Sequence, residues 1–359
     1  MDLIRSLIYS TDARIVFALW VGIAVFIIAL VMMVAILIMR QWAKRMEARH
    51  LRIATMWKQI LLDTANGKKV DPVPSLSRWQ VSGFVDAWNE VHDILGVVKH
   101  PAFGDIARAI DLERRLYMHL DHGSFHDRVM AIIAMGHLGS DTHFSKLVQS
   151  LDDPSPIISL TAARAMLRID PDRAVDSVVP QILTRPDWIA GGVATILDEA
   201  GPGAVSNQLK AQALRVNDEL APRMLRFLGD ISPEDAAPVI RDLLSGEHDD
   251  QLVSTCLQML SEPGDLHLVR PLLTHPRWHV RMHSASAIGR LGNRQDEVTL
   301  LPLLGDAQWW VRYRAAQALS TLLNRDAVAL TGIRDKQDDR FAKDILDHVM
   351  AEVALGVRA

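Results

Sequence analysis

Three histidines at four-residue spacing are the arrangement in the sequence that comes nearest to a metal site. His275, His279 and His283 would line up along one face of a continuous helix, where two imidazoles can hold a zinc ion. Pro276 indicates, however, that His275 lies in the loop before the helix. Since no carboxylate or thiolate stands beside these histidines in the sequence to complete a ligand set, we expect solvated imidazoles on a helix face.

The remaining candidates for chemistry are weaker still. His119, His122 and His126 form a looser group at an expected helix end, and the same interpretation applies to them. Cys256 is the only cysteine, and it falls in a small-residue slot that predicts a buried, inert thiol. The sequence contains no Walker loop, no Gly-x-Ser-x-Gly, no paired cysteines and no His-Glu-x-x-His. It therefore predicts no catalytic residue, no cofactor and no bound metal.

The elements that carry these residues come from a repeat with a period close to 31 residues. The clearest copies are VRMHSASAIGRLG from Val280 and VRYRAAQALSTLL from Val311. Walking back with that template places copy starts at Asp127, Ile158, Ile189, Leu220, Leu252, Val280 and Val311. The apolar residues eight positions after these starts, which we expect to share one buried slot, are Met135, Met166, Leu197, Leu228, Leu260, Ile288 and Leu319. Such a period predicts a stacked helical solenoid.

Each copy is expected to form a helix–turn–helix unit, with a turn rich in Gly and Asp between its two helices. Four prolines recur in the second helices, at first-turn or kink positions where a missing backbone donor is tolerable: Pro180, Pro238, Pro271 and Pro302. No segment alternates apolar and polar residues well enough to predict a sheet. The expected fold class is therefore all-α: a solenoid of helical hairpins with one N-terminal transmembrane helix.

The last copies resemble a known family. Asp306 and Arg312, with Val311 before the arginine and Ala-Ala-x-Ala-Leu after it, resemble a HEAT repeat of the short bacterial type. The resemblance implies that Asp306 and Arg312 form a structural ladder pair between neighbouring units. It covers roughly residues 127–325 and weakens toward the earlier copies, where Asp153, for example, precedes Ser159. It implies a scaffold or a binding surface and names no reaction.

The N-terminal region predicts an uncleaved membrane anchor. Ile15 to Met39 are 25 residues without a charge, which is enough to cross the hydrocarbon core. A signal peptide would have a shorter apolar core, of about 7 to 15 residues, and a small-residue cleavage site after it. Basic residues and an indole follow instead, as at a membrane interface. The expected anchor residues are Ile15, Trp20, Phe26, Met39, Arg40, Trp42, Lys44 and Arg45.

Charge predicts the orientation of this anchor and the class of partner. Residues 1–60 carry 8 basic against 3 acidic residues, whereas residues 61–359 carry 31 basic against 40 acidic ones. Most of the early basic residues follow the apolar span, so the positive-inside bias predicts an outside N-terminus and a cytoplasmic solenoid at the inner (plasma) membrane. A basic segment next to a membrane favours anionic lipid headgroups, and the acidic body argues against nucleic acid as a partner.

The expected organisation has six parts. We predict an extracytoplasmic N-terminus (1–14), a transmembrane helix (15–39), a juxtamembrane basic helix and linker (40–70), an N-terminal helical cap (71–122), HEAT-like repeats (123–325) and C-terminal capping helices (326–359). In the cap, Trp79 and Trp88 are expected to lie on an apolar face with Phe84 and to pack in the core. Exposed recognition by these two indoles is the alternative.

Two functional classes remain. The favoured one is a non-enzymatic membrane-anchored scaffold that binds a protein partner, and the resemblance implies for some such proteins a membrane glycosyltransferase or envelope polysaccharide machinery. The alternative is a ligand-binding module or lyase-type enzyme built on HEAT-like repeats. For the scaffold, the expected partner-binding residues at successive repeat starts are Trp278, Trp309, Trp310, Arg281 and Arg312. The competing interpretation is that these indoles fill gaps between repeats.

Overall fold

The computed structural model describes residues 13–68, 70–96 and 101–355, and all regular elements in these ranges are helical. The all-α fold expected from the repeat is therefore confirmed. The predicted extracytoplasmic N-terminus lies almost wholly outside the described residues, as does the side chain of Ile15. The chain divides into two compact units, Met1–Leu138 and Gly139–Ala359, which are described separately below.

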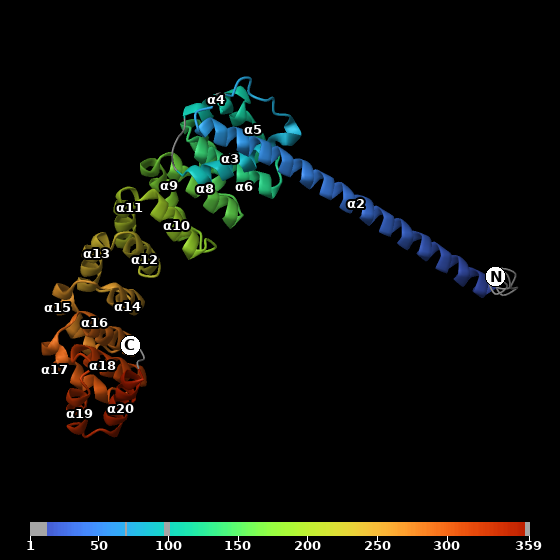
Figure 1. The fold of residues 1–359 in the computed structure, drawn as a ribbon. Coiled ribbons are helices and arrows are strands. Elements are labelled where there is room, and N and C mark those ends of the chain that lie inside the picture. The colour runs from blue at the N-terminus through green and yellow to red at the C-terminus, as the bar shows by residue number, and fades with distance from the viewer. Residues whose placement is uncertain (1–12, 69, 97–100, 356–359) are drawn as a thin grey trace. The chain divides into compact units, whose positions relative to one another are not determined.

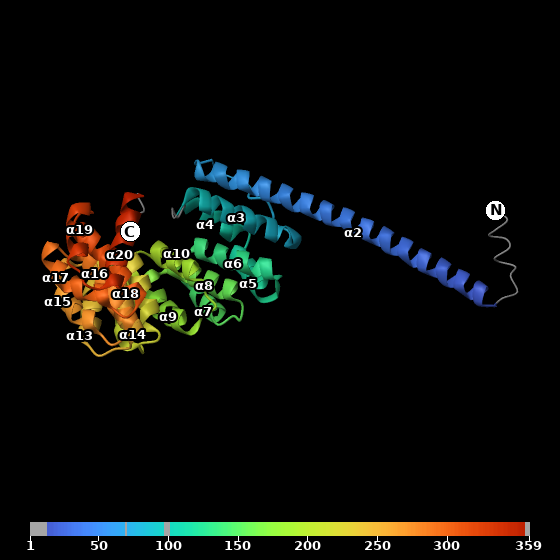
Figure 2. The same cartoon turned by 90° about the horizontal axis from the view of Figure 1, so that it is seen from below.

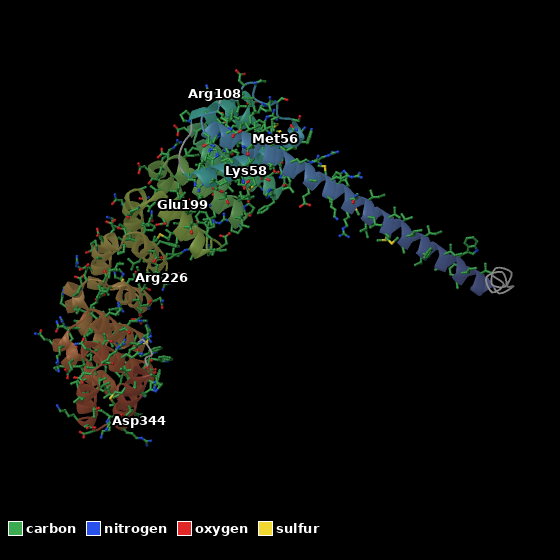
Figure 3. All side chains as sticks on the ribbon, in the orientation of Figure 1. Met56, Lys58, Arg108, Glu199, Arg226 and Asp344 are labelled. Carbon is green, nitrogen blue, oxygen red and sulfur yellow. The ribbon has the colours of Figure 1, made fainter. Side chains whose placement is uncertain are left out.

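The first unit begins with α2, a single helix of 53 residues from Ala13 to Ala65 (Figure 1). Among the described residues it is the one helix long and apolar enough to cross a membrane. Its apolar half has no protein around it, and Figure 3 shows those side chains projecting freely. Four of the predicted anchor residues are between 61% and 69% exposed: Trp20, Phe26, Met39 and Trp42. Large apolar side chains with such exposure are typical of a helix that spans a membrane.

The second half of α2 packs along α3 (Val81–Leu95), and Figure 2 shows the two helices side by side. Trp57, Leu61 and Thr64 recur at helical spacing on the buried face of α2. Gly83 allows the close approach, because a Cβ there would lie 3.1 Å from Ile53 Cγ2. The ring of Trp57 meets that of Phe84 edge-on at 4.9 Å. The helix therefore continues out of the apolar span and becomes part of the folded unit.

The rest of this unit is built from η1 (Arg78–Gln80), α4 (Pro101–Ala109), α5 (Leu112–His122) and α6 (Phe125–Leu138). Trp88 is 1% exposed and packs against Phe84 and Phe103, as predicted. Trp79 is 64% exposed, so the prediction of a core role for it is wrong. It lies on the 3-10 turn before α3, where the helical stripe of Phe84 and Trp88 does not extend.

The second unit is a stack of helical pairs. After η2 (Asp141–His143) and α7 (Phe144–Leu151), the first helices of successive repeats are α8 (Pro156–Ile169), α10 (Ala190–Ala200), α12 (Ala221–Ile231), α14 (Asp250–Met259), α16 (Trp278–Leu291) and α18 (Trp309–Leu322). Each of these helices contacts the next, and together they form one layer. Every first helix, α6 of the other unit included, begins within two residues of a predicted copy start.

The second helices form the other layer, and Figure 1 shows α11, α13 and α15 on the opposite side of the stack from α10, α12 and α14. They are α9 (Pro171–Thr184), α11 (Pro202–Arg215), α13 (Pro233–Ser245), α15 (Leu266–Val269), α17 (Glu297–Leu300) and α19 (Ala327–Asp335). The 3-10 turns η3 (Pro263–Asp265) and η5 (Arg294–Asp296) precede α15 and α17. The helix α20 (Arg340–Ala354) then packs on α18 and α19.

The recurring prolines act as predicted only in part. Pro180 and Pro238 lie inside regular helices. At Pro271 and Pro302 the second helix changes to a 3-10 helix, forming η4 (Arg270–Thr274) and η6 (Leu301–Gly305). Proline has no backbone N–H to continue the α-helical ladder, and the tighter 3-10 turn accommodates that loss.

The shared apolar slot of the repeat is buried in every copy. Six of its seven members are 0% exposed and Leu260 is 3% exposed, so the predicted register is confirmed. Small residues bring the first helices together: Gly289 of α16 lies so close to α18 that a Cβ there would come within 2.7 Å of Ala318 Cβ. The repeat thus determines where each first helix begins and which residues lie at the start of that helix.

Candidate partner-binding surface

A ladder of ion pairs ties successive second helices together. Lys210 of α11 pairs with Asp235 at the start of α13, Arg241 of α13 with Asp265, and Arg270 with Asp296, each at 2.8 Å. The carboxylates of Asp265 and Asp296 are almost fully buried. The repeat template did not predict this ladder, although an acidic residue at or just before the start of these second helices and a basic one in the preceding unit recur at about the repeat period.

The first helices have a ladder of their own, and it differs from the expected pair of Asp306 with Arg312. The carboxylate of Asp306 binds Arg281 of the preceding repeat, with Nε–Oδ2 at 2.7 Å and Nη2–Oδ1 at 2.9 Å. Arg312 instead donates to the backbone carbonyl of Asp306 at 2.7 Å. The predicted side-chain pair is therefore replaced by a bond between repeats, because the loop turns the Asp306 carboxylate back toward α16.

The two arginines perform the same local task. Arg281 donates to the carbonyls of His275 and Pro276, and Arg312 to those of Asp306 and Ala307. Asp306 also accepts from the backbone N–H of Gln308, which closes the loop before α18. These contacts hold the loops that lead into α16 and α18. We therefore assign Arg281 and Arg312 to positioning the repeat ends, since their guanidinium groups already have acceptors within the chain.

The Asp306 carboxyl has a lowered pKa. Burial by itself would raise that pKa, but the hydrogen bonds from Arg281 and from the backbone N–H of Gln308 outweigh burial. The hydrogen bond to Asp306 correspondingly raises the pKa of Arg281. The stability that this pair contributes is present above the usual carboxyl pKa of about 4 and is lost as the pH falls through the lower, folded value.

Replacing Asp306→Asn should lower the free energy of unfolding by about 2 kcal/mol at pH 7, because Arg281 is left half-buried without its anion. The difference from the parent protein should shrink as the pH falls below about 4, where the carboxyl of the unfolded chain takes up a proton, and should vanish below the lower pKa of folded Asp306. Urea melts of the full chain in detergent at pH 7 and at acid pH measure both effects. Asp344→Asn, on an exposed carboxylate of α20, is the control, and a pH-independent difference for Asp306→Asn would contradict the assignment.

At the exposed ends of these first helices stand three indoles. Trp278 is the first residue of α16, and Trp309 and Trp310 open α18. Trp278 is 39% exposed, Trp309 42% and Trp310 50%, so a large part of each indole is in contact with solvent. Trp309 stacks on Tyr313 at 4.9 Å and meets Trp310 edge-on at 4.7 Å. Trp309, Trp310 and Tyr313 contact one another, whereas Trp278, at the equivalent position of the preceding repeat, meets His279 edge-on at 5.7 Å. We call these four residues, Trp278, Trp309, Trp310 and Tyr313, the aromatic cluster.

Polar contacts fix the inner side of the aromatic cluster. The Tyr313 hydroxyl lies 3.0 Å from Glu352 Oε1 of α20 and accepts from Gln317 Nε2 at 2.7 Å. Burial and the nearby Glu352 carboxylate raise the pKa of Tyr313, which keeps its proton. Arg314 Nη1 donates to Gln317 Oε1 at 2.8 Å. The hydrogen bonds of the Tyr313 hydroxyl thus fix the stacked Trp309–Tyr313 pair, which presents a preformed apolar face to solvent.

Two hollows lie along the same layer of first helices. One, of about 760 Å³, lies between the starts of α10 and α12 and is lined by Trp188, Ile189, Arg226 and Phe227. The other, of about 430 Å³, lies over α14, α16 and α18 beside His283, Arg290 and Arg314. Ile189 is 78% exposed at the first hollow. The layer of first helices therefore carries both exposed apolar side chains and hollows.

The candidates for metal chemistry are not assembled. His275 lies before α16, as Pro276 predicted, and contacts Asp250, while His283 lies 3.0 Å from Gln258 Nε2. Burial lowers the pKa of His283. The described part of the chain holds no group of three His, Cys, Asp or Glu placed to bind a metal ion. Cys256 is fully buried, as expected, and burial raises its pKa to about 12.

Comparison with known proteins supports the repeat interpretation. A family model described as HEAT repeats matches residues 266–346, which run from α15 into α20. Over these residues the chain resembles HEAT repeats, and its described residues form an all-helical repeat fold. Two crystal structures of engineered proteins are similar at 18% and 16% identity, covering 76% and 68% of this chain and 85% and 92% of theirs, with TM-scores of 0.28 and 0.22. Those scores are too low to support any shared detail. No curated protein matches the sequence.

Proposed function

We propose that this HEAT-like protein is a non-enzymatic, membrane-anchored scaffold whose layer of first helices binds a protein partner. The observation that supports it most is the aromatic cluster, because its three indoles are partly exposed and Trp309 is held in place by stacking on Tyr313. Tryptophan is over-represented among residues that dominate binding energy, and a rigid ring loses little entropy on binding.

The repeat architecture supports the same proposal. Helical repeats present long surfaces that are organised before binding, and here both layers are fixed by ladders between neighbouring repeats. The HEAT match covers the part of the chain that carries the aromatic cluster.

We propose further that α2 anchors the chain in the inner membrane through residues 15–39. After this span come the basic segment and linker (40–70), the cap (71–122), the repeats (123–325) and the capping helices (326–359). The exposed apolar half of α2 supports a span, and the basic residues after Met39 support anionic lipid headgroups at the cytoplasmic face. A membrane-associated partner fits this placement, and a glycosyltransferase of the envelope polysaccharide machinery is our candidate.

The orientation gives a prediction of its own. A reporter that is active only in the cytoplasm, fused after Ala359, should be active, because the basic residues between Arg40 and Lys58 favour the inside. The same fusion with a periplasm-dependent reporter should be inactive. The opposite pattern would reverse the orientation and place the aromatic cluster outside the cell membrane.

The proposed function is tested by purification from detergent-solubilised membranes with the full chain as bait. We expect one membrane protein to co-purify in a defined ratio and to be lost when the aromatic cluster is altered. A small molecule that co-purifies without any protein would favour the ligand-binding alternative and would point to the hollow beside Arg226.

A further inference from the structure

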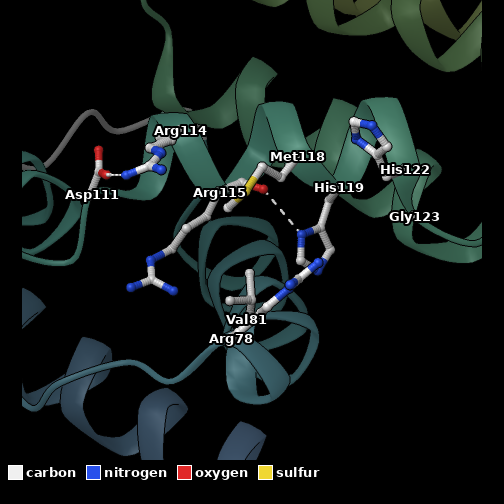
Figure 4. A pocket seen from close by; sticks show the side chains of 9 residues that line it. All are labelled: Arg78, Val81, Asp111, Arg114, Arg115, Met118, His119, His122 and Gly123. Atoms are coloured by element: carbon white, nitrogen blue, oxygen red, sulfur yellow. Dashed lines mark hydrogen bonds and ion pairs between the residues drawn. The ribbon is translucent and has the colours of Figure 1, made fainter.

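The first unit contains a basic pocket that neither the fold nor the proposed scaffold explains. It measures about 280 Å³ and lies between η1 and one face of α5 (Figure 4). Arg114, Arg115, His119 and His122 line it from α5 at helical spacing, and Arg78 enters from η1. The single carboxylate in its lining, Asp111, stands 3.9 Å from Arg114. The lining therefore carries an excess of cationic and imidazole groups.

Two of the side chains in this lining have no polar partner among the described residues. The side chains of Arg78 and His122 make no hydrogen bond or ion pair with any residue that the structure describes. Arg115 donates from Nε to the carbonyl of Ile110 at 2.7 Å, which leaves its two terminal nitrogens for a ligand. Figure 4 shows the head of Arg78 directed toward His119 across the pocket. Guanidinium groups arranged around a small hollow suit the oxygens of a phosphate group.

The pocket lies at the end of the cap that is nearest the apolar half of α2. Helix α3 runs in the same direction as α2, because Gly83 lies against His50 and Ile53, whereas Glu90 further along pairs with Lys58. The start of α3 and η1 before it therefore lie at the end of the cap nearest the apolar half of α2. Ser82 Oγ, 3.4 Å from His119 Nε2, ties α5 to the same end.

The length of α2 brings this end close to a membrane. From Met39 to His50, the first residue that pairs with the cap, the helix rises roughly 16 Å at about 1.5 Å per residue. The headgroup layer takes up roughly 5 to 8 Å of this. Arg40, Lys44, Arg45 and Arg49 fill the interval, and Trp79, beside Arg78, is 64% exposed at the same end of the cap. Exposed indoles and long basic side chains are typical of a membrane interface.

We propose that the pocket between Arg78, Arg115 and His119 binds the phosphate of an anionic phospholipid headgroup and so seats the cap on the membrane surface. The inference rests on the proposed anchor in α2 and extends it, because it adds a specific lipid site to a non-specific span. Trp79 would enter the interface beside the bound headgroup, with its exposed indole among the lipid headgroups.

The test uses the full chain purified in a neutral detergent, with dioctanoyl phosphatidylglycerol, dioctanoyl phosphatidylcholine and inorganic phosphate as three separate probes. We expect phosphatidylglycerol to bind at least tenfold more tightly than the other two. Arg78→Gln should lose that preference at least tenfold without a change in melting temperature, since its side chain makes no polar bond to any described residue. Arg108→Gln, on the exposed face of α4, is the matched control and should bind like the parent protein.

Three outcomes would overturn the lipid site: equal binding of inorganic phosphate, no preference for phosphatidylglycerol, or unchanged binding by Arg78→Gln. Equal binding of inorganic phosphate would mark the pocket as a site for a free phosphate. Alkaline carbonate extraction of the parent chain from membranes tests the anchor separately. A chain that is extracted overturns the proposed anchor, whereas a chain that resists extraction but shows no lipid preference overturns only the pocket.

Discussion

Replacing Trp278 and Trp309 together by alanine should weaken partner binding by at least about 100-fold. Each indole is partly exposed at the start of a first helix, and a buried interface tryptophan commonly contributes about 2 kcal/mol or more to binding. The rings contribute less to the fold than a core residue does, because 39% of Trp278 and 42% of Trp309 are in water. Co-purification from solubilised membranes measures the loss, and the melting temperature reports the fold.

The matched control for this pair is Trp79→Ala. Trp79 is more exposed than either indole of the cluster, yet it lies in the first unit on the turn before α3. It should retain partner binding in full. If Trp79→Ala loses the partner and the double variant keeps it, the partner binds the cap and the aromatic cluster is not the site.

The second large effect concerns the core of the repeats. Ile288→Ala should lower the free energy of unfolding by about 2 to 5 kcal/mol, because Ile288 is 0% exposed and its removal leaves a cavity between α16 and its neighbours. In a repeat stack the loss also weakens the interfaces with adjoining units, so α14 and α18 should become easier to open. Hydrogen exchange of the full chain would detect faster exchange in these helices.

Val298→Ala provides the comparison for Ile288→Ala. Val298 belongs to the same repeat but is 72% exposed on the outer layer, so its replacement should change stability by less than about 0.5 kcal/mol. Equal effects of the two substitutions would mean that the predicted register does not define the core.

The register of the first helices could be predicted because the same pattern of apolar residues recurs in every copy of the repeat. One slot, eight positions after each start, is apolar in all copies, and helical periodicity alone then fixes the buried face. The position of His275 before its helix followed from Pro276. These features depend on local chemistry, which one sequence can reveal.

The ladder between repeats could not be predicted in the same way. Spacing within one copy suggested Asp306 with Arg312, but the direction of the Asp306 carboxylate depends on the loop geometry, which brings Arg281 of the preceding copy nearer. Trp79 illustrates a second limit, since a single 3-10 turn takes it off the stripe that the helix pattern assigned to it. The basic pocket of the first unit joins residues from η1 and α5 that are far apart in the sequence.

Site-specific photo-crosslinking in native membranes tests the scaffold most directly. A photo-reactive amino acid would be introduced at Trp310, which is 50% exposed in the aromatic cluster, and separately at Val298 on the outer layer. The scaffold predicts a single covalent adduct with another membrane protein from position 310 and none from position 298. An adduct from position 298 alone, or no protein adduct at position 310, would contradict it.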